Sequence, residues 1–117
     1  MEYEVIPTQK FEDDLAYYYK KKKYRSIYDD VSEVVATLKS GNLVGDAIPN
    51  LRCRNSTIKV RVANSDTHSG KSNGYRLIYY AIINDREIYL LTIYSKKDDN
   101  DIPSDSEIIE MVNQIGD

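Results

Sequence analysis

Two apolar stripes at helical spacing run through the first forty residues. The first stripe consists of Phe11, Leu15 and Tyr18. Thr8 precedes it as the expected N-cap, and the lysine run at 20–23 favours the end of that helix. The second stripe consists of Ile27, Val31, Val34, Val35 and Leu38. We therefore predict a helical hairpin that ends by about residue 40.

Short signals flank these two helices. Residues 2–6 alternate between polar and apolar and predict a strand ahead of the first helix. Ser26 and Asp29 form a capping box in which Asp takes the usual place of Glu. Gly41 is the expected stop of the second helix.

The apolar period changes to two in the second half of the chain. Residues 57–63 alternate strictly and place Lys59 and Arg61 on the polar face, which predicts a half-buried strand with a cationic open side. Residues 75–83 and 88–94 are apolar and rich in tyrosine. They predict two central strands, joined by a tight turn.

The remaining segments are loops and one more helix. Residues 45–50 and 64–74 are polar and read as loops. Ser104 and Glu107 form a capping box for a short final helix. The predicted order is β-α-α-β-β-β-α, an α+β fold with an antiparallel sheet, an N-terminal helical hairpin, a short C-terminal helix, and all helices on one side of the sheet.

Length and composition limit what the chain can be. With 117 residues, of which 41% are hydrophobic, residues 1–117 are expected to form one domain with a modest core. No apolar run of about 18 residues and no basic, apolar leader is present, so we expect a cytoplasmic protein without a membrane partner. The single cysteine, Cys53, excludes an internal disulfide and is expected to be half-buried filler.

Charge is distributed unevenly along the chain. The net charge is −3, yet residues 52–76 hold six Lys or Arg residues against the single acid Asp66. Every charged residue after Lys97 is acidic, beginning with Asp98. This arrangement predicts a basic centre and an acidic end.

Several familiar sites are absent from the sequence. No P-loop, HExxH or dinucleotide fingerprint occurs; Gly70-Lys71-Ser72 imitates the end of a Walker A motif, but position 65 is Ser where Gly is required. One His and one Cys do not build a common zinc site, so no metal and no cofactor are expected. A Ser–His–Asp triad would have to use His68, but nothing in the sequence singles out one serine as its nucleophile.

A cationic site remains as the main candidate. The candidate catalytic residues are Lys59, Arg61, His68, Lys71, Arg76 and Lys97, and the candidate RNA- or ribosome-binding residues are Arg52, Arg54, Tyr94 and Lys96. Cleavage of an RNA phosphodiester needs a base for the 2′-hydroxyl, cations for the phosphorane and a proton for the leaving 5′-oxygen. Arginine matches phosphate oxygens with its planar fork, and Tyr94 offers a ring for base stacking.

The alternative is that these residues only keep the exposed face of the sheet soluble and have no role in a site. For Lys59 or Arg61 taken singly, the sequence supports this alternative and a functional role equally. For His68, which lies in a polar loop, it favours simple exposure to solvent. Arg76 stands in an otherwise apolar run, which favours function. We accordingly expect the Arg76→Ala variant to keep its fold.

The strongest stretches of the chain resemble a known family. Residues 59–63, the loop Gly70-Lys71-Ser72-Asn73-Gly74, the strand that begins Gly74-Tyr75-Arg76, and residues 88–97 resemble the RelE/ParE superfamily of toxins from type II toxin–antitoxin modules, nearest the HigB-like branch. The resemblance covers residues 48–103 and extends loosely to the helical hairpin.

The resemblance implies a microbial-RNase-like fold and cleavage of mRNA during translation on the ribosome. It also implies a cognate antitoxin, often one with a helix-turn-helix domain. By the same resemblance Arg76 contacts the scissile phosphate, Lys59 and Arg61 belong to the preceding basic strand, and Lys97 stands where RelE-like members hold a second catalytic arginine. The place of the family's C-terminal catalytic tyrosine falls near Pro103, so this chain departs from the pattern there.

Three functions remain open at this point. The first is a ribosome-dependent mRNA endoribonuclease, metal-independent and acting through 2′-hydroxyl attack. The second is a non-enzymatic gyrase inhibitor of the ParE type, which needs no phosphate-neutralising cluster. The third is an inactive, partner-binding member of the family. The basic strand and loop favour the first.

Overall fold

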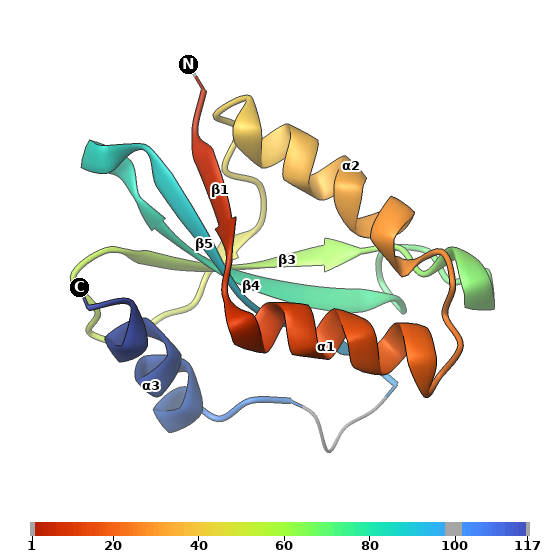
Figure 1. The fold of residues 1–117 in the computed structure, drawn as a ribbon. Coiled ribbons are helices and arrows are strands. Elements are labelled where there is room, and N and C mark those ends of the chain that lie inside the picture. Colours follow the sequence, from red (N-terminus) through yellow and green to blue (C-terminus); the bar gives the residue numbers. More distant parts are fainter. Residues whose placement is uncertain (1, 98–101, 117) are drawn as a thin grey trace.

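A five-stranded mixed sheet forms the centre of the molecule (Figure 1). The computed structural model describes residues 2–97 and 102–116. Its strands are β1 (Glu4–Pro7), β2 (Asp46–Ala47), β3 (Ser56–Val62), β4 (Tyr75–Ile82) and β5 (Glu87–Ser95), in the spatial order β1-β5-β4-β3-β2. Strand β1 pairs in parallel with β5, and the other neighbours are antiparallel.

The α+β class is confirmed, but the predicted order and sheet type are wrong in part. A two-residue strand, β2, lies inside the predicted loop 45–50. The parallel β1–β5 pair makes the sheet mixed rather than antiparallel. Hydrophobic alternation reveals a strand and its buried side but not its neighbour or direction, so the pattern of β1 contained no signal for this pairing.

Three helices accompany the sheet: α1 (Gln9–Lys20), α2 (Ile27–Lys39) and α3 (Asp105–Ile115). Two predicted caps are confirmed. The Thr8 side chain accepts from the Phe11 N–H, and Ser104 and Glu107 form both bonds of a capping box. Gly41 follows α2 with a φ of 94°, as a helix-stopping glycine does.

The predicted capping box at the start of α2 is wrong. The Ser26 side chain makes no cap hydrogen bond. Its backbone N–H instead donates to Asp66 Oδ2 at 2.9 Å, and the Asp30 carboxylate accepts from the Ser65 N–H at 3.0 Å. The loop after β3 therefore fixes the start of α2, an arrangement that local sequence does not show.

Both faces of the sheet are covered, which contradicts the expectation of helices on one side. Side chains of α1 and α2 pack with Tyr75, Leu77 and Tyr79 on one face. Helix α3 packs with Ile78 and Tyr80 on the opposite face. Every residue of β4 is buried, which confirms it as a central strand covered on both sides.

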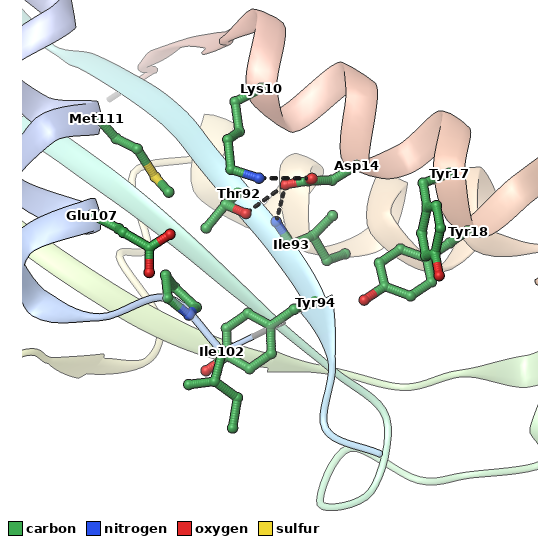
Figure 2. Close-up of a pocket in the computed structure, with 11 residues that line it drawn as sticks. Lys10, Asp14, Tyr17, Tyr18, Thr92, Ile93, Tyr94, Ile102, Glu107 and Met111 are labelled. Atoms are coloured by element: carbon green, nitrogen blue, oxygen red, sulfur yellow. Dashed lines mark hydrogen bonds and ion pairs between the residues drawn. The ribbon is translucent and has the colours of Figure 1, made fainter. Parts of the chain in front are cut away.

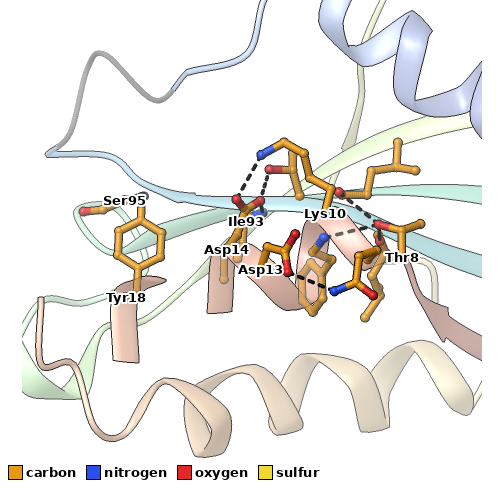
Figure 3. A network of polar contacts seen from close by, with 12 residues as sticks. Thr8, Lys10, Asp13, Asp14, Tyr18, Ile93 and Ser95 are labelled. Atoms are coloured by element: carbon orange, nitrogen blue, oxygen red, sulfur yellow. Dashed lines mark hydrogen bonds and ion pairs between the residues drawn. The ribbon is translucent and has the colours of Figure 1, made fainter. Parts of the chain in front are cut away.

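Helix α1 closes the outer edge of β5 beyond its short pairing with β1 (Figure 3). The Asp14 carboxylate accepts from the Ile93 N–H at 3.3 Å and from the Thr92 hydroxyl. The Tyr18 hydroxyl accepts from the Ser95 N–H at 2.8 Å. These side chains satisfy edge groups that would otherwise offer a template for another strand.

Candidate functional site: a cationic groove

An open groove with a volume of about 520 Å³ lies on the α3 side of the sheet, where β3 and β5 end and β4 begins. It is called the cationic groove below. Its lining consists of Asp46, Ala47, Ile48, Pro49, Lys59, Arg61, Arg76, Tyr94, Lys96 and Ile102. Four of these side chains are Lys or Arg and only Asp46 is acidic, so the groove favours an anionic ligand.

A row of three side chains crosses the floor of the groove. Arg61 of β3 lies opposite Arg76 of β4, which lies opposite Tyr94 of β5. Side chains opposite each other on neighbouring antiparallel strands have Cβ atoms roughly 4.5–5.5 Å apart. Lys59 stands two residues before Arg61 on the same face, and the Lys96 N–H, just beyond β5, donates to the Gly74 carbonyl at 2.9 Å.

Arg76 is the most enclosed cation of the groove, with 8% of its surface exposed. Its Nη1 donates to the carbonyls of Lys71 and Tyr75, both at 3.1 Å, and its Nη2 donates to the Ser72 carbonyl at 3.0 Å. A guanidinium has five N–H donors, so Nε–H and one Nη2–H make no hydrogen bond to any part of the chain that the structure describes. Those two donors are available to a phosphate.

These bonds also give Arg76 a structural role that its sequence position does not reveal. The guanidinium joins the Lys71 and Ser72 carbonyls of the turn before β4 to the carbonyl of Tyr75, the first residue of β4. The expectation that Arg76→Ala leaves the fold unaffected rested on Arg76 having no supporting role, and this geometry removes that reason.

Burial and neighbouring charges shift the pKa of Arg76 and of Tyr94. Burial, and then the charge of Arg61, lower the pKa of Arg76, although an arginine stays protonated at neutral pH. Burial raises the pKa of the Tyr94 hydroxyl, and the charge of Arg76 opposes that rise. The Tyr94 phenol therefore keeps its proton at neutral pH and can donate it, while a bound anion would relieve the repulsion between the arginines.

Gly74 permits the tight turn that brings Arg76 beside β3. A Cβ atom at position 74 would lie 2.2 Å from the Val62 carbonyl oxygen and 2.9 Å from the Asn64 nitrogen. Both neighbours are backbone atoms of the adjoining strand end, so they cannot move aside as a flexible side chain could. Only glycine fits this approach.

The structure brings five of the ten sequence-predicted site residues into the groove: Lys59, Arg61, Arg76, Tyr94 and Lys96. Lys96, rather than the predicted catalytic Lys97, lines it. Tyr94 is only 5% exposed, so its ring offers little surface for base stacking and its hydroxyl is the more useful group.

The other predicted residues lie elsewhere. His68 is an exposed residue with φ of 54° at the end of the short turn Ser65–Thr67, which contacts the start of α2. Arg52 and Arg54 are exposed in the loop before β3 and do not line the cationic groove. The acidic run at 98–101 lies outside the described residues.

Lys71 lines a second groove on the other side of β3. This edge groove, with a volume of about 480 Å³, lies between α2, the segment 44–46 and residues 59–63 of β3 and its end. Lys59 and Arg61 line both grooves. Lys71 is thus near the same cations, but not in the cationic groove itself.

Two parts of the site were missed from the sequence. Residues 46–49, which were expected to be part of a loop, form one wall of the cationic groove. Ile102, which lies close to the place where the family tyrosine would fall, lines the groove as an apolar group. The apolar residues Ala47 and Ile48 within the polar loop were the only feature of the sequence that could have indicated the wall at 46–49.

A further pocket of about 410 Å³ adjoins the groove between α1, β5 and α3 (Figure 2). Tyr94 and Ile102 line both cavities, and the far end holds Asp14, bonded to Lys10 Nζ at 2.9 Å. Because both oxygens of the Asp14 carboxylate already accept hydrogen bonds, this pocket offers no free carboxylate at that end.

Comparisons with known proteins add no identification. No family model matches the chain, and no characterised protein matches it in sequence. Within residues 2–97 and 102–116, no group of three or more His, Cys, Asp or Glu could hold a metal ion. No helix in the same ranges has the length and apolar character needed to cross a membrane.

Proposed function

We propose that the protein is an endoribonuclease that cuts mRNA on the ribosome without a metal ion, as the toxin of a type II toxin–antitoxin module. The row Arg61–Arg76–Tyr94 supports this proposal more than any other observation. It combines two cations for one phosphate with an enclosed hydroxyl that carries a proton. The family resemblance of residues 59–63, 70–80 and 88–97 points to the same activity.

The proposed reaction is a transesterification. The substrate's 2′-oxygen attacks phosphorus, the P–O5′ bond breaks, and a 2′,3′-cyclic phosphate and a free 5′-hydroxyl result. Arg61 and the two available donors of Arg76 neutralise the phosphorane. Tyr94 protonates the leaving 5′-oxygen: its hydroxyl is protonated at neutral pH, and the charge of Arg76 opposes the rise in its pKa that burial causes.

The proton of the 2′-hydroxyl needs a second group. The groove holds two candidates for it, Lys59 and Lys96, at opposite ends of the row, and only the neutral amine form of a lysine accepts a proton. Replacing each by Gln in turn separates them, because loss of the base lowers kcat while loss of a phosphate contact chiefly raises KM. His68 and Lys97 are not assigned a role.

Growth and cleavage together test the proposal. We would induce the wild type and the Arg61→Gln variant in bacteria and map the ends of a translated mRNA by primer extension. Arrest with cuts in phase with codons, both lost in the variant, is the expected result. Growth arrest without cuts would contradict the ribonuclease and favour inhibition of a bound target such as gyrase. Soluble protein that causes no arrest would favour an inactive, partner-binding protein. Rescue by a gene adjacent to the reading frame would identify the antitoxin.

A further inference from the structure

The loop between β3 and β4, residues 64–74, lies beside the start of α2 (Figure 1). No residue from Ser65 to Asn73 is buried, and none of them is apolar apart from a glycine. Hydrophobic burial therefore does not fix this β3–β4 loop, and its placement depends on hydrogen bonds. Such bonds tie it to the rest of the chain at two places, the start of α2 and the Arg76 guanidinium.

Two carboxylates join the loop to α2, one from each side. The Asp30 carboxylate accepts from the Ser65 N–H at 3.0 Å through one oxygen and from the Ser65 hydroxyl through the other. The Asp66 carboxylate accepts from the Ser26 N–H, just ahead of the helix, at 2.9 Å. Because both oxygens of Asp30 bind one residue, they fix the orientation of Ser65 as well as its position.

Backbone bonds carry this anchor to the far part of the loop. Asn64 and Ser69 each donate their N–H to the other's carbonyl at 3.0 Å, so the first half of the loop is closed on itself. The backbone of Asn64 also lies so close to Gly74 that a side chain there would not fit. Residues 70–73 therefore form an arch that is held at both ends.

The arch supplies the carbonyls that orient Arg76. Its Nη1 donates to the Lys71 carbonyl and its Nη2 to the Ser72 carbonyl. The third acceptor, the Tyr75 carbonyl, belongs to the preceding residue, and a bond to it alone would let the guanidinium plane rotate. The two carbonyls of the arch fix that plane, and with it the direction of the donors that remain for a phosphate.

We propose that Asp30 is a positioning residue of the cationic groove. It anchors the β3–β4 loop through Ser65, and the anchored loop sets the orientation of the Arg76 guanidinium. Asp30 does not line the cationic groove, so its effect on a reaction there passes through the loop and Arg76. That catalytic effect rests on the proposed ribonuclease function, whereas the orientation of Arg76 does not.

Asp29 provides a matched control. Both aspartates lie in the first turn of α2, where a negative charge stabilises the helix. Asp29→Ala and Asp30→Ala therefore remove the same kind of charge, but the second also releases Ser65. Asp30→Asn removes the charge and keeps the anchor, because an amide oxygen accepts from the Ser65 N–H and the amide nitrogen can donate to its hydroxyl.

The motion of the guanidinium can be measured without RNA. In protein that carries ¹⁵N-labelled arginine, the order parameter of the Arg76 Nε–H group reports how firmly it is held, and Arg76→Lys assigns its signal. The order parameter should be high in the wild type, Asp29→Ala and Asp30→Asn, and should fall in Asp30→Ala. Ser65→Ala loses one of the two contacts and should show a smaller fall, which keeps the test available if Asp30→Ala does not fold.

Cleavage kinetics on translating ribosomes provide a second readout. Arg76 keeps its charge in Asp30→Ala but loses its orientation, so kcat should fall about tenfold to a hundredfold with little change in KM. Asp29→Ala and Asp30→Asn should cleave like the wild type.

Two results would overturn the inference. One is an order parameter at Arg76 that is unchanged in Asp30→Ala and Ser65→Ala. The other is an Asp30→Asn variant as deficient as Asp30→Ala, which would make the charge rather than the anchor the cause. If Asp30→Ala releases Arg76 but the wild type cuts no mRNA, the ribonuclease alone is refuted. If the wild type cuts mRNA and Arg76 is held equally in every variant, the positioning role alone is refuted.

Discussion

Arg61 lies directly opposite Arg76 across the antiparallel pair β3–β4, so two guanidinium groups share one floor of the cationic groove. Like charges in such a pair destabilise a sheet, and no described acid forms an ion pair with either of them. A pair of like charges that no described acid offsets is typical of a site that binds an anion.

The first prediction concerns this repulsion. Arg61→Gln removes one of the two charges and should leave stability unchanged or raise it by about 0.2–1 kcal/mol, while RNA binding weakens. Urea denaturation gives the first quantity and a filter-binding titration the second. Arg54→Gln is the control, expected to change neither by much. A loss of stability in Arg61→Gln would show that Arg61 supports the sheet rather than a ligand.

Arg76 should behave differently because its guanidinium bonds three carbonyls. Arg76→Ala leaves those carbonyls without this partner, so we expect a loss of roughly 1–3 kcal/mol in the free energy of unfolding. Arg76→Lys keeps the charge but not the fork, and should lose cleavage while it retains part of the stability. Equal stability of wild type and Arg76→Ala, measured by urea denaturation, would contradict the structural role described here.

Two glycines of one loop form a matched pair. A methyl group at Gly74 meets the Val62 carbonyl at 2.2 Å, whereas one at Gly70 meets nothing within 4 Å. Gly74→Ala should therefore destabilise the protein by about 1–3 kcal/mol and displace Arg76 from Arg61. Gly70→Ala should be neutral or slightly stabilising. Thermal unfolding distinguishes them, and similar melting temperatures would argue against this tight turn.

Alkaline pH should weaken the fold through buried tyrosines. Burial raises the pKa of Tyr75 and of Tyr79 well above the ordinary value of about 10. Both remain protonated in the folded state while the unfolded chain ionises, so this contribution is complete below about pH 10 and declines as the pH rises further. Stability measured by urea denaturation between pH 8 and pH 11 should follow this decline.

Phenylalanine variants separate these two tyrosines. The Tyr75 hydroxyl is buried and has no hydrogen-bond partner among the described residues, so Tyr75→Phe should be nearly neutral at pH 7 and should flatten the alkaline decline. Tyr79→Phe flattens the decline as well, but loses the bond to the Val44 carbonyl and about 1 kcal/mol. A large loss at pH 7 in Tyr75→Phe would mean that its hydroxyl is bonded.

The sequence predicted most elements because each has a local cause. Thr8 and Ser104 are helix caps whose bonds lie within one turn, and the alternation of Ile58, Val60 and Val62 reports one buried face directly. Pairing has no such local cause. The parallel partner of β1, the placement of α3 on the second face and the departure of Val44 from the sheet all depend on residues distant in sequence.

The sequence predicts the part of the candidate site that follows from alternation along single strands and from the order of neighbouring strands. Lys59 and Arg61 share a face by alternation alone, and Arg76 begins the next strand of a hairpin. Whether Lys96 or Lys97 enters the groove depends on the end of β5, where a shift of one residue exchanges the faces. His68 could not be placed, because the turn that carries it is fixed by contacts with α2.

The state of the RNA ends tests the central claim most directly. Purified protein would be added to ribosomes that are translating a defined mRNA, and the new 5′ ends would be analysed for wild type, Arg61→Gln and Lys97→Gln. We predict 5′-hydroxyl ends and 2′,3′-cyclic phosphates, lost in Arg61→Gln and retained in Lys97→Gln. Intact mRNA with folded wild-type protein, or new ends that carry 5′-phosphates, would contradict a metal-free transesterification in the cationic groove.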